Sequence, residues 1–285
     1  MNNKFLGNAA CLLKYDLVSK LSGSLTLPVW YITMMTELED RNKGDRNATN
    51  YRLGTQNETL LGLMKSTFYG EESSLNDVYD HLREQKIKLR AITARNNQKA
   101  ENYRIGNISF FNHKERDPYF QGLVSLIDKA TDQVLFIDPD MGILPSAKKL
   151  KSAKGSAMIT SLELKYIMDN ISEESIVMVS QQLNDYSYSH ETRVKDLQPD
   201  INPNVILLVD EVIQAGVYFF TKSQACHDIL LAFLWEFLNQ YRFLKSTERV
   251  MIISGSKEGI LTKPLGEKVN NKNGKAEATP VSEEA

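Results

Sequence analysis

Apolar and polar residues follow two different periods along the chain, one typical of helices and one typical of strands. Leu13, Leu17 and Leu21 lie four residues apart within residues 8–22, which predicts a helix with one buried face. Helical patterns recur at 57–68, 74–86, 117–130, 161–170 and 224–244. Short apolar runs rich in β-branched and aromatic residues predict strands at 29–33, 102–111, 133–138, 175–180, 204–210, 216–221 and 250–253.

The alternation of strands with helices indicates an α/β fold, in which a Rossmann-like, mostly parallel sheet carries helices on both faces. A polar piece that ends in Gly216 separates the apolar runs 204–210 and 216–221, which predicts a late antiparallel hairpin and therefore an antiparallel strand at one edge of the sheet. Residues 1–262 are expected to form a single domain. Residues 263–285 contain almost no apolar side chains, so we expect a disordered tail there.

The composition is that of an ordinary globular protein. The chain has 285 residues, of which 42% are hydrophobic and 25% are charged, with a formal net charge of -2. These values exclude collagen-like, disulfide-scaffold and wholly disordered proteins. The 34 Lys and Arg residues are balanced by 36 Asp and Glu residues, so nucleic-acid binding would require a local basic face.

Cysteine content and hydropathy bear on the location of the protein. Cys11 and Cys226 are too few for a disulfide framework, which favours a reducing compartment and predicts a cytoplasmic protein. No stretch approaches the ~20 apolar residues that span a bilayer, so no membrane partner is expected. The sequence does not indicate an oligomeric state.

Two acidic residues follow the most apolar strand pattern in the chain. The segment FIDPD places Asp138 at the last strand position and Asp140 just beyond Pro139, which turns the chain away. Ligands of open α/β sheets bind at the carboxyl ends of the strands, so we expect Asp138 to be exposed at the rim. We interpret Asp138 and Asp140 as catalytic residues that accept a hydrogen bond from a substrate amine or hydroxyl or help to hold a metal. A strand that simply ends in Asp-Pro is the alternative, because turns favour both residues.

Further polar residues suggest a substrate-binding segment. Gln181, Gln182 and Asn184 follow the strand at 175–180, and His190 lies shortly after them. Amide groups pair with base edges, which predicts a substrate-binding lip over Asp138; a plain polar loop is the alternative.

In the long polar loop 37–56, Glu37 is a candidate for binding a cofactor ribose, or else the loop is a solvated charged segment.

A second kind of chemistry is open at the same strand ends. Asp210 and Glu211 end the strand at 204–210 and, with Asp138 and Asp140, could bind Mg²⁺ in a metal-dependent nuclease or phosphodiesterase. The four histidines show no ligand spacing, so no zinc site is expected. The adjacent Cys226 and His227 lie in an apolar helix pattern, which indicates a buried structural cysteine.

Residues 7–16, GNAACLLKYD, resemble the Gly-Asn-x-Ala-Asp-x-x-Lys-His stretch near the N-terminus of the bacterial 23S ribosomal RNA adenine-N6 methyltransferases. Residues 136–142, FIDPDMG, are similar to the strand of those enzymes that ends in the catalytic Asp-Pro-Pro-Tyr motif. The resemblance implies an S-adenosylmethionine-dependent methyltransferase that acts on an amine of a nucleobase or nucleic acid. It also implies that the cofactor lies at the end of the first strand, over residues 33–40, beginning with Thr33.

Carried onto this sequence, the resemblance implies that Asn8 and Lys14 lie near the cofactor or a substrate phosphate. Tyr15 stands where the family has histidine and is expected beside them. Asp138 would face the target amine.

Two departures from the family affect the predicted chemistry. Met34 to Glu37 replace the glycines that let the backbone approach the cofactor. Asp140 and Met141 replace the proline and the aromatic residue that stacks on the adenine. A noncatalytic binding protein on a degenerate methyltransferase scaffold, acting in phage–host conflict, is therefore a third hypothesis.

Overall fold

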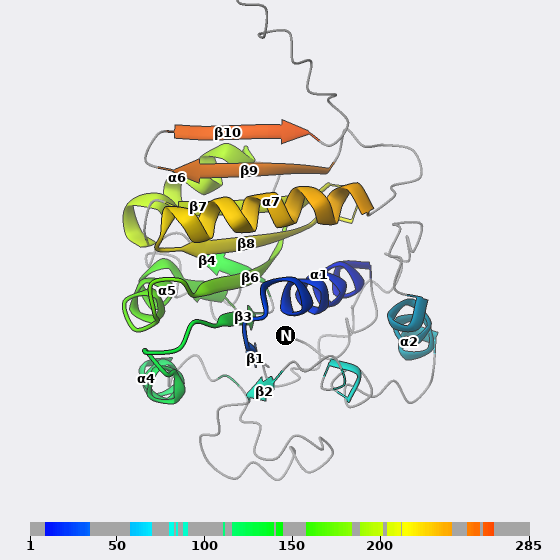
Figure 1. Cartoon of the computed structure of the whole chain (residues 1–285), viewed down its shortest axis with the longest axis horizontal. Helices are drawn as coiled ribbons and strands as arrows, with labels where there is room; N and C mark the ends of the chain where they lie inside the picture. Colours follow the sequence, from blue (N-terminus) through cyan, green and yellow to red (C-terminus); the bar gives the residue numbers. More distant parts are fainter. Residues whose placement is uncertain are drawn as a thin grey trace, which may run out of the picture.

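The computed structural model of the chain is shown in Figure 1. It describes residues 9–34, 58–69, 80–82, 84, 88–90, 111, 116–139, 141–144, 158–183, 189–201, 204–211, 213–240, 250–256 and 259–264. Structural statements below concern these residues. Asn8, Glu37, Asp140 and Asn184, together with most of the predicted strand 102–111, lie outside them.

Eight strands form the main sheet in the order β10-β9-β7-β8-β6-β3-β1-β2. Their bounds are Val29–Thr33 (β1), Lys88–Arg90 (β2), Val134–Asp138 (β3), Ile176–Gln182 (β6), Asn204–Asp210 (β7), Ala215–Thr221 (β8), Val250–Ser256 (β9) and Gly259–Pro264 (β10). The pairings place six strands in one direction, with β8 and β9 opposed to them. Most strands thus share a direction, although four of the seven neighbouring pairs are antiparallel.

Two further strands, β4 (Gly142–Leu144) and β5 (Met158–Thr160), pair in parallel as a separate small sheet. The helices of the described part are α1 (Ala9–Leu25), α2 (Glu58–Tyr69), α4 (Arg116–Leu126), α5 (Ser161–Met168), α6 (His190–Ile201) and α7 (Gln224–Gln240).

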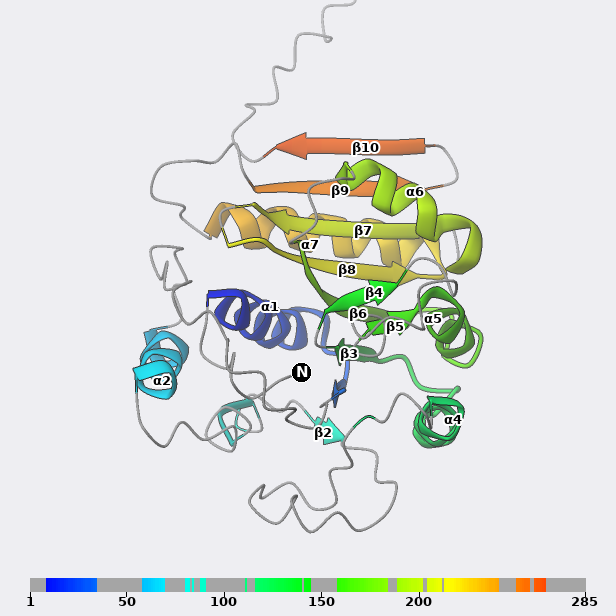
Figure 2. The ribbon, with the colours of Figure 1, turned by 180° about the vertical axis from the view of Figure 1, so that it is seen from behind.

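Helices cover both faces of the main sheet, as predicted (Figures 1 and 2). Alternate strand residues belong to two separate cores because successive side chains point to opposite faces. In β3, Val134 and Phe136 join the core under α1, α2 and α7. Leu135 and Ile137 join the core under α4, α5 and α6. We call these the α1 face and the α5 face.

The late hairpin is confirmed, but its predicted position is wrong. β7 and β8 pair antiparallel over their whole lengths. They lie inside the sheet, however, because β8 also pairs with β6 and β7 also pairs with β9. The edge is formed by β10, which the sequence pattern did not predict. Strand β10 ends at Pro264, two residues beyond the expected domain boundary at 262.

Most of the predicted helices in the described part of the chain are found, and one helix was missed. The helices predicted at 57–68, 117–130, 161–170 and 224–244 are found as α2, α4, α5 and α7. Helix α6 was missed because it is strongly polar and contains Pro199 near its end. No helix in the described ranges has the length and apolar character needed to cross a bilayer.

Candidate functional site

The candidate site lies where β1, β3 and β6 reach their carboxyl ends. Strand β1 has β2 on one side and β3 on the other, so the strand order reverses between β1 and β3. Thr33, the last residue of β1, is the register partner of Asp138, the last residue of β3. Such a reversal is the usual ligand position in an open α/β sheet. The backbone of Thr33 therefore lies beside Asp138 at this reversal.

Among the described residues, three side chains from three different elements donate hydrogen bonds to Asp138. Its Oδ2 accepts a hydrogen bond from Lys14 Nζ on α1 at 2.7 Å and from Tyr31 OH on β1 at 2.7 Å. Its Oδ1 accepts a hydrogen bond from Ser180 Oγ on β6 at 2.5 Å. The acid therefore joins the N-terminal helix to the three strands at the centre of the parallel half of the sheet.

The prediction that Asp138 is exposed at the rim is wrong. The residue is 1% exposed. Its side chain follows Val134 and Phe136 onto the α1 face, where helix α1 covers the strand end and Lys14 contacts the carboxylate. Any ligand of this carboxylate must therefore approach through groups that already contact it.

Tyr15 contacts Tyr31 and Lys14, two of the side chains that bind Asp138. Its hydroxyl lies 3.0 Å from the hydroxyl of Tyr31, and the two rings meet edge to face with centroids 5.8 Å apart. Tyr15 is 0% exposed, and Lys14 Nζ lies 5.2 Å from the centroid of its ring. The predicted cofactor residues Lys14 and Tyr15 are thus brought to Asp138, Lys14 as a direct partner and Tyr15 through Tyr31.

The environment of Asp138 favours its ionised form. Burial by itself raises the pKa of a carboxyl group, but the charge of Lys14 and the hydrogen bonds from Lys14 and Ser180 outweigh it and leave the pKa of Asp138 below its ordinary value. The site accordingly holds a carboxylate anion next to a lysine ammonium.

Sequence reasoning missed Tyr31 and Ser180. Both carry a hydroxyl near the carboxyl end of a buried strand, and both point to the same face as Asp138. The usable signal was a polar group at the last residue of β3 and two residues before the last residue of β1 and of β6. This signal was overlooked because Tyr31 and Ser180 lie inside the apolar runs and were interpreted only as strand residues.

The predicted substrate lip does not form as one cluster. Gln181 and Gln182 are consecutive in β6, so their side chains point to opposite faces of the sheet. Gln181 is 7% exposed and hydrogen-bonds the backbone of β4 and of Met141. His190 begins α6, where its Nε2 lies 3.3 Å from Glu211 Oε1.

The acidic residues of β3 and β7 do not share a metal. Strands β6 and β8 lie between β3 and β7, so the ends of the two strands are separated by three strand spacings, about 14 Å at ~4.8 Å each. Asp210 is buried and accepts a hydrogen bond from the backbone N–H of Ile213 at 3.3 Å. Within the described residues, no group of three or more His, Cys, Asp or Glu side chains could hold a metal ion.

Cys226 and His227 are buried in α7, as the sequence indicated. His227 Nε2 lies 2.9 Å from Ser254 Oγ on β9. Burial, assisted by the charges of Glu174 and Asp132, raises the pKa of the Cys226 thiol to about 12. A thiolate nucleophile is not available at this position near neutral pH.

Comparison with known proteins gives little beyond these observations. No protein-family model matches the chain, and no curated protein matches it. Among solved structures, the chain is similar to the crystal structure of protein LPL1258 from Legionella pneumophila str. Philadelphia 1, described with the family model DUF519. The identity is 16% and the TM-score 0.47, over 88% of this chain and 98% of that one. At this level the similarity supports no conclusion about function or site.

Proposed function

We propose that this protein is an S-adenosylmethionine-dependent methyltransferase that acts on an amine of a nucleobase or nucleic acid. The observation that supports the proposal is the contact between Lys14 and Asp138, which are 124 residues apart. Each belongs to one of the two segments that resemble the 23S ribosomal RNA adenine-N6 methyltransferases. The resemblance concerns sequence alone, and the meeting of the two segments is independent of it.

The sheet is compatible with the cofactor position in this proposal. The Rossmann-like character of the fold is part of the proposal, and a reversal of strand order at β1 and β3 supports it. Met34 stands where the family has glycine, but it is 1% exposed and its side chain packs in the core of the α5 face. That side chain therefore does not occupy the α1 face, where Asp138 lies.

In this reaction the cofactor supplies an activated methyl group, and the protein supplies position and charge. The carboxylate of Asp138 accepts a hydrogen bond from the target amine and orients its lone pair. Lys14 keeps the carboxylate ionised, and Tyr31 and Ser180 fix its plane. Because Lys14 Nζ already bonds Oδ2, the target amine must displace Lys14 or bind beside it.

The same contact favours a second candidate, a noncatalytic binding protein on this scaffold. In that case the ion pair of Lys14 and Asp138 is a permanent structural link, and no amine ever reaches the acid. Both candidates keep the cytoplasmic location expected from the sequence. No observation on the described residues favours the metal-dependent nuclease.

Calorimetry and a transfer assay test the proposal. We expect S-adenosylmethionine and its demethylated product to bind at micromolar concentration. We also expect the labelled methyl group to pass to unmodified ribosomal RNA made in vitro. Asp138→Asn should abolish transfer, whereas Asp169→Asn should not, because Asp169 belongs to an exposed ion pair with Lys165 on α5.

The outcomes separate the candidates. Binding without transfer would favour the noncatalytic protein. Failure of both compounds to bind at high micromolar concentration would remove the methyltransferase proposal.

A further inference from the structure

The small sheet of β4 and β5 begins close to the candidate acid in the sequence. Only residues 139–141 separate Asp138 from β4, and three residues span at most about 11 Å. Met141, the residue directly before β4, is bound by Gln181 through its carbonyl. The small sheet is anchored from two sides, by Gln181 on β6 and by Arg116 on α4.

Gln181 forms the first anchor. Its side-chain Oε1 accepts a hydrogen bond from the backbone N–H of Ile143 at 2.8 Å, and its Nε2 donates to the carbonyl of Met141 at 3.1 Å. Between them lies Gly142, whose φ of 101° strongly favours glycine. A Cβ on Gly142 would collide with the Gln181 amide. The amide therefore occupies the space that only a glycine leaves open.

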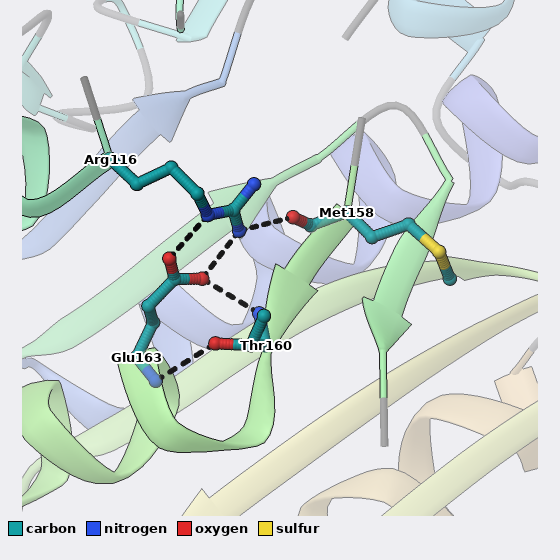
Figure 3. Close-up of polar contacts among 4 residues, drawn as sticks. All are labelled: Arg116, Met158, Thr160 and Glu163. Carbon is teal, nitrogen blue, oxygen red and sulfur yellow. Dashed lines mark hydrogen bonds and ion pairs between the residues drawn. The ribbon is translucent and has the colours of Figure 1, made fainter. Parts of the chain in front are cut away.

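Arg116 forms the second anchor (Figure 3). Its Nε and Nη2 donate to the two carboxylate oxygens of Glu163 at 2.5 Å each, and Nη2 also donates to the carbonyl of Met158 at 2.7 Å. The Arg116 and Glu163 side chains are only 10% and 14% exposed. The bidentate contact with Glu163 and the bond to Met158 together join the first residue of β5 to the start of α5.

The carboxylate of Glu163 also binds Thr160, the last residue of β5. Glu163 Oε2 accepts the backbone N–H of Thr160 at 2.8 Å, while Thr160 Oγ1 accepts the backbone N–H of Glu163 at 3.2 Å. This reciprocal capping box starts α5. Arg116 and Glu163 thus fix β5 at both its first and its last residue, and β5 pairs with β4 through Gly142 and Met158.

We propose that Arg116 and Gln181 are positioning residues that together fix the small sheet of β4 and β5, and with it Met141, three residues beyond Asp138, on the acceptor side of the site. The acceptor role rests on the proposed function; the fixing of the strands does not. Arg116 is suited to this because its rigid planar group makes parallel hydrogen bonds that a lysine cannot reproduce.

Hydrogen exchange of the full chain tests the positioning. In Arg116→Lys, the backbone amides of β4 and β5 should exchange about tenfold faster, the scale of one lost hydrogen bond, while those of β7 and β8 stay unchanged. Gln181→Met should accelerate exchange at Ile143 in the same way and serves as the second variant if Arg116→Lys does not fold. Lys165→Gln, which removes an exposed ion pair on the same helix α5, is the matched control. Unchanged exchange in β4 and β5 of both variants would overturn the proposal.

A second measurement tests the link to the site. Arg116→Lys should keep the Kd for S-adenosylmethionine within about twofold and lower methyl transfer to unmodified ribosomal RNA at least about tenfold, through kcat or through KM for the RNA. A merely structural role would lower cofactor binding and transfer together, and that result would overturn the acceptor assignment. If the unaltered chain binds no cofactor, the proposed function and the acceptor assignment both fail, whereas hydrogen exchange still decides the anchoring.

Discussion

The ion pair of Lys14 and Asp138 gives the sharpest prediction, because both groups are buried and bound to each other. Asp138→Asn leaves the ammonium of Lys14 without its counter-charge at a residue that is 9% exposed. Breaking a buried pair in this way costs about 3–5 kcal/mol. Lys14→Met leaves a buried carboxylate that keeps its bonds from Tyr31 and Ser180, so we expect about 3 kcal/mol, the lower end of that range.

The double variant, compared with the two single variants, measures the interaction free energy between Lys14 and Asp138. With both charges removed, neither is left buried alone, so the double variant should lose about as much stability as one single variant. The coupling free energy then equals the cost of the other single variant, about 3–5 kcal/mol. For the exposed pair of Lys165 and Asp169, whose side chains are 49% and 57% exposed, the same cycle should give only about 0.3–0.5 kcal/mol.

Urea unfolding at pH 7, followed by tryptophan fluorescence, measures all four free energies of unfolding. The dependence on urea should have the same slope in every variant, since the folded state is unchanged. A coupling below about 0.5 kcal/mol for Lys14 and Asp138 would refute the reasoning, because it would mean that the two groups do not interact in the folded protein.

The pH dependence of the free energy of unfolding gives an independent check on the ion pair. In the unaltered chain the folded pKa of Asp138 is below its ordinary value of 3.8, so its contribution to stability is present above that value and is lost as the pH falls through the folded pKa. In Lys14→Met the ammonium no longer offsets the effect of burial, so the pKa of Asp138 should rise relative to that in the unaltered chain. The contribution of the carboxylate to stability is then smaller at neutral pH and is lost at a higher pH as the pH falls. The stability difference between the two proteins should therefore grow from pH 3 to pH 7.

Three further predictions concern single buried groups. Tyr31→Phe removes a hydrogen bond to a charged acceptor and should lower the free energy of unfolding by about 1.5–3 kcal/mol in urea titrations; a smaller loss than 0.5 kcal/mol would contradict the contact. Because burial raises the pKa of Cys226 to about 12, its thiol should resist iodoacetamide at pH 8 until the protein unfolds, as followed by mass spectrometry. Desolvation lowers the pKa of His227, so its contribution to stability should be present above pH 6.5 and be lost as the pH falls, and His227→Gln should flatten that part of the stability profile.

Local patterns were sufficient to predict most helices and central strands. The apolar runs of β3, β6, β7 and β8 and the buried face of α1 are visible in the sequence because each satisfies its own period. The order of strands is not a local property. Nothing in the residues of the β7–β8 hairpin distinguishes an edge position from one between β6 and β9, since both require apolar side chains on each face.

The environment of Asp138 was predictable only in part. Its place at a strand end follows from the sequence, but its direction depends on which face α1 covers. Every position of β3 is buried, so no polar residue in the strand marks one face as outward. Lys14 was expected near the cofactor or a substrate phosphate, and its ion pair with Asp138 became visible only once α1 and β3 were placed together.

Two consecutive residues of β6 contact two different parts of the molecule, the Asp138 site and the small sheet of β4 and β5. Ser180 faces Asp138, and Gln181, the next residue, faces Gly142 on the opposite side. An insertion of one residue earlier in β6 would shift the register by one, bringing the apolar side chain of Val179 to the acid and the hydroxyl of Ser180, which is too short to replace the amide, to the glycine. The neighbours β3 and β8 pair with β6 on both sides and resist such a slip. A one-residue insertion within β6 should therefore impair both the contact of Ser180 with Asp138 and the contact of Gln181 with β4.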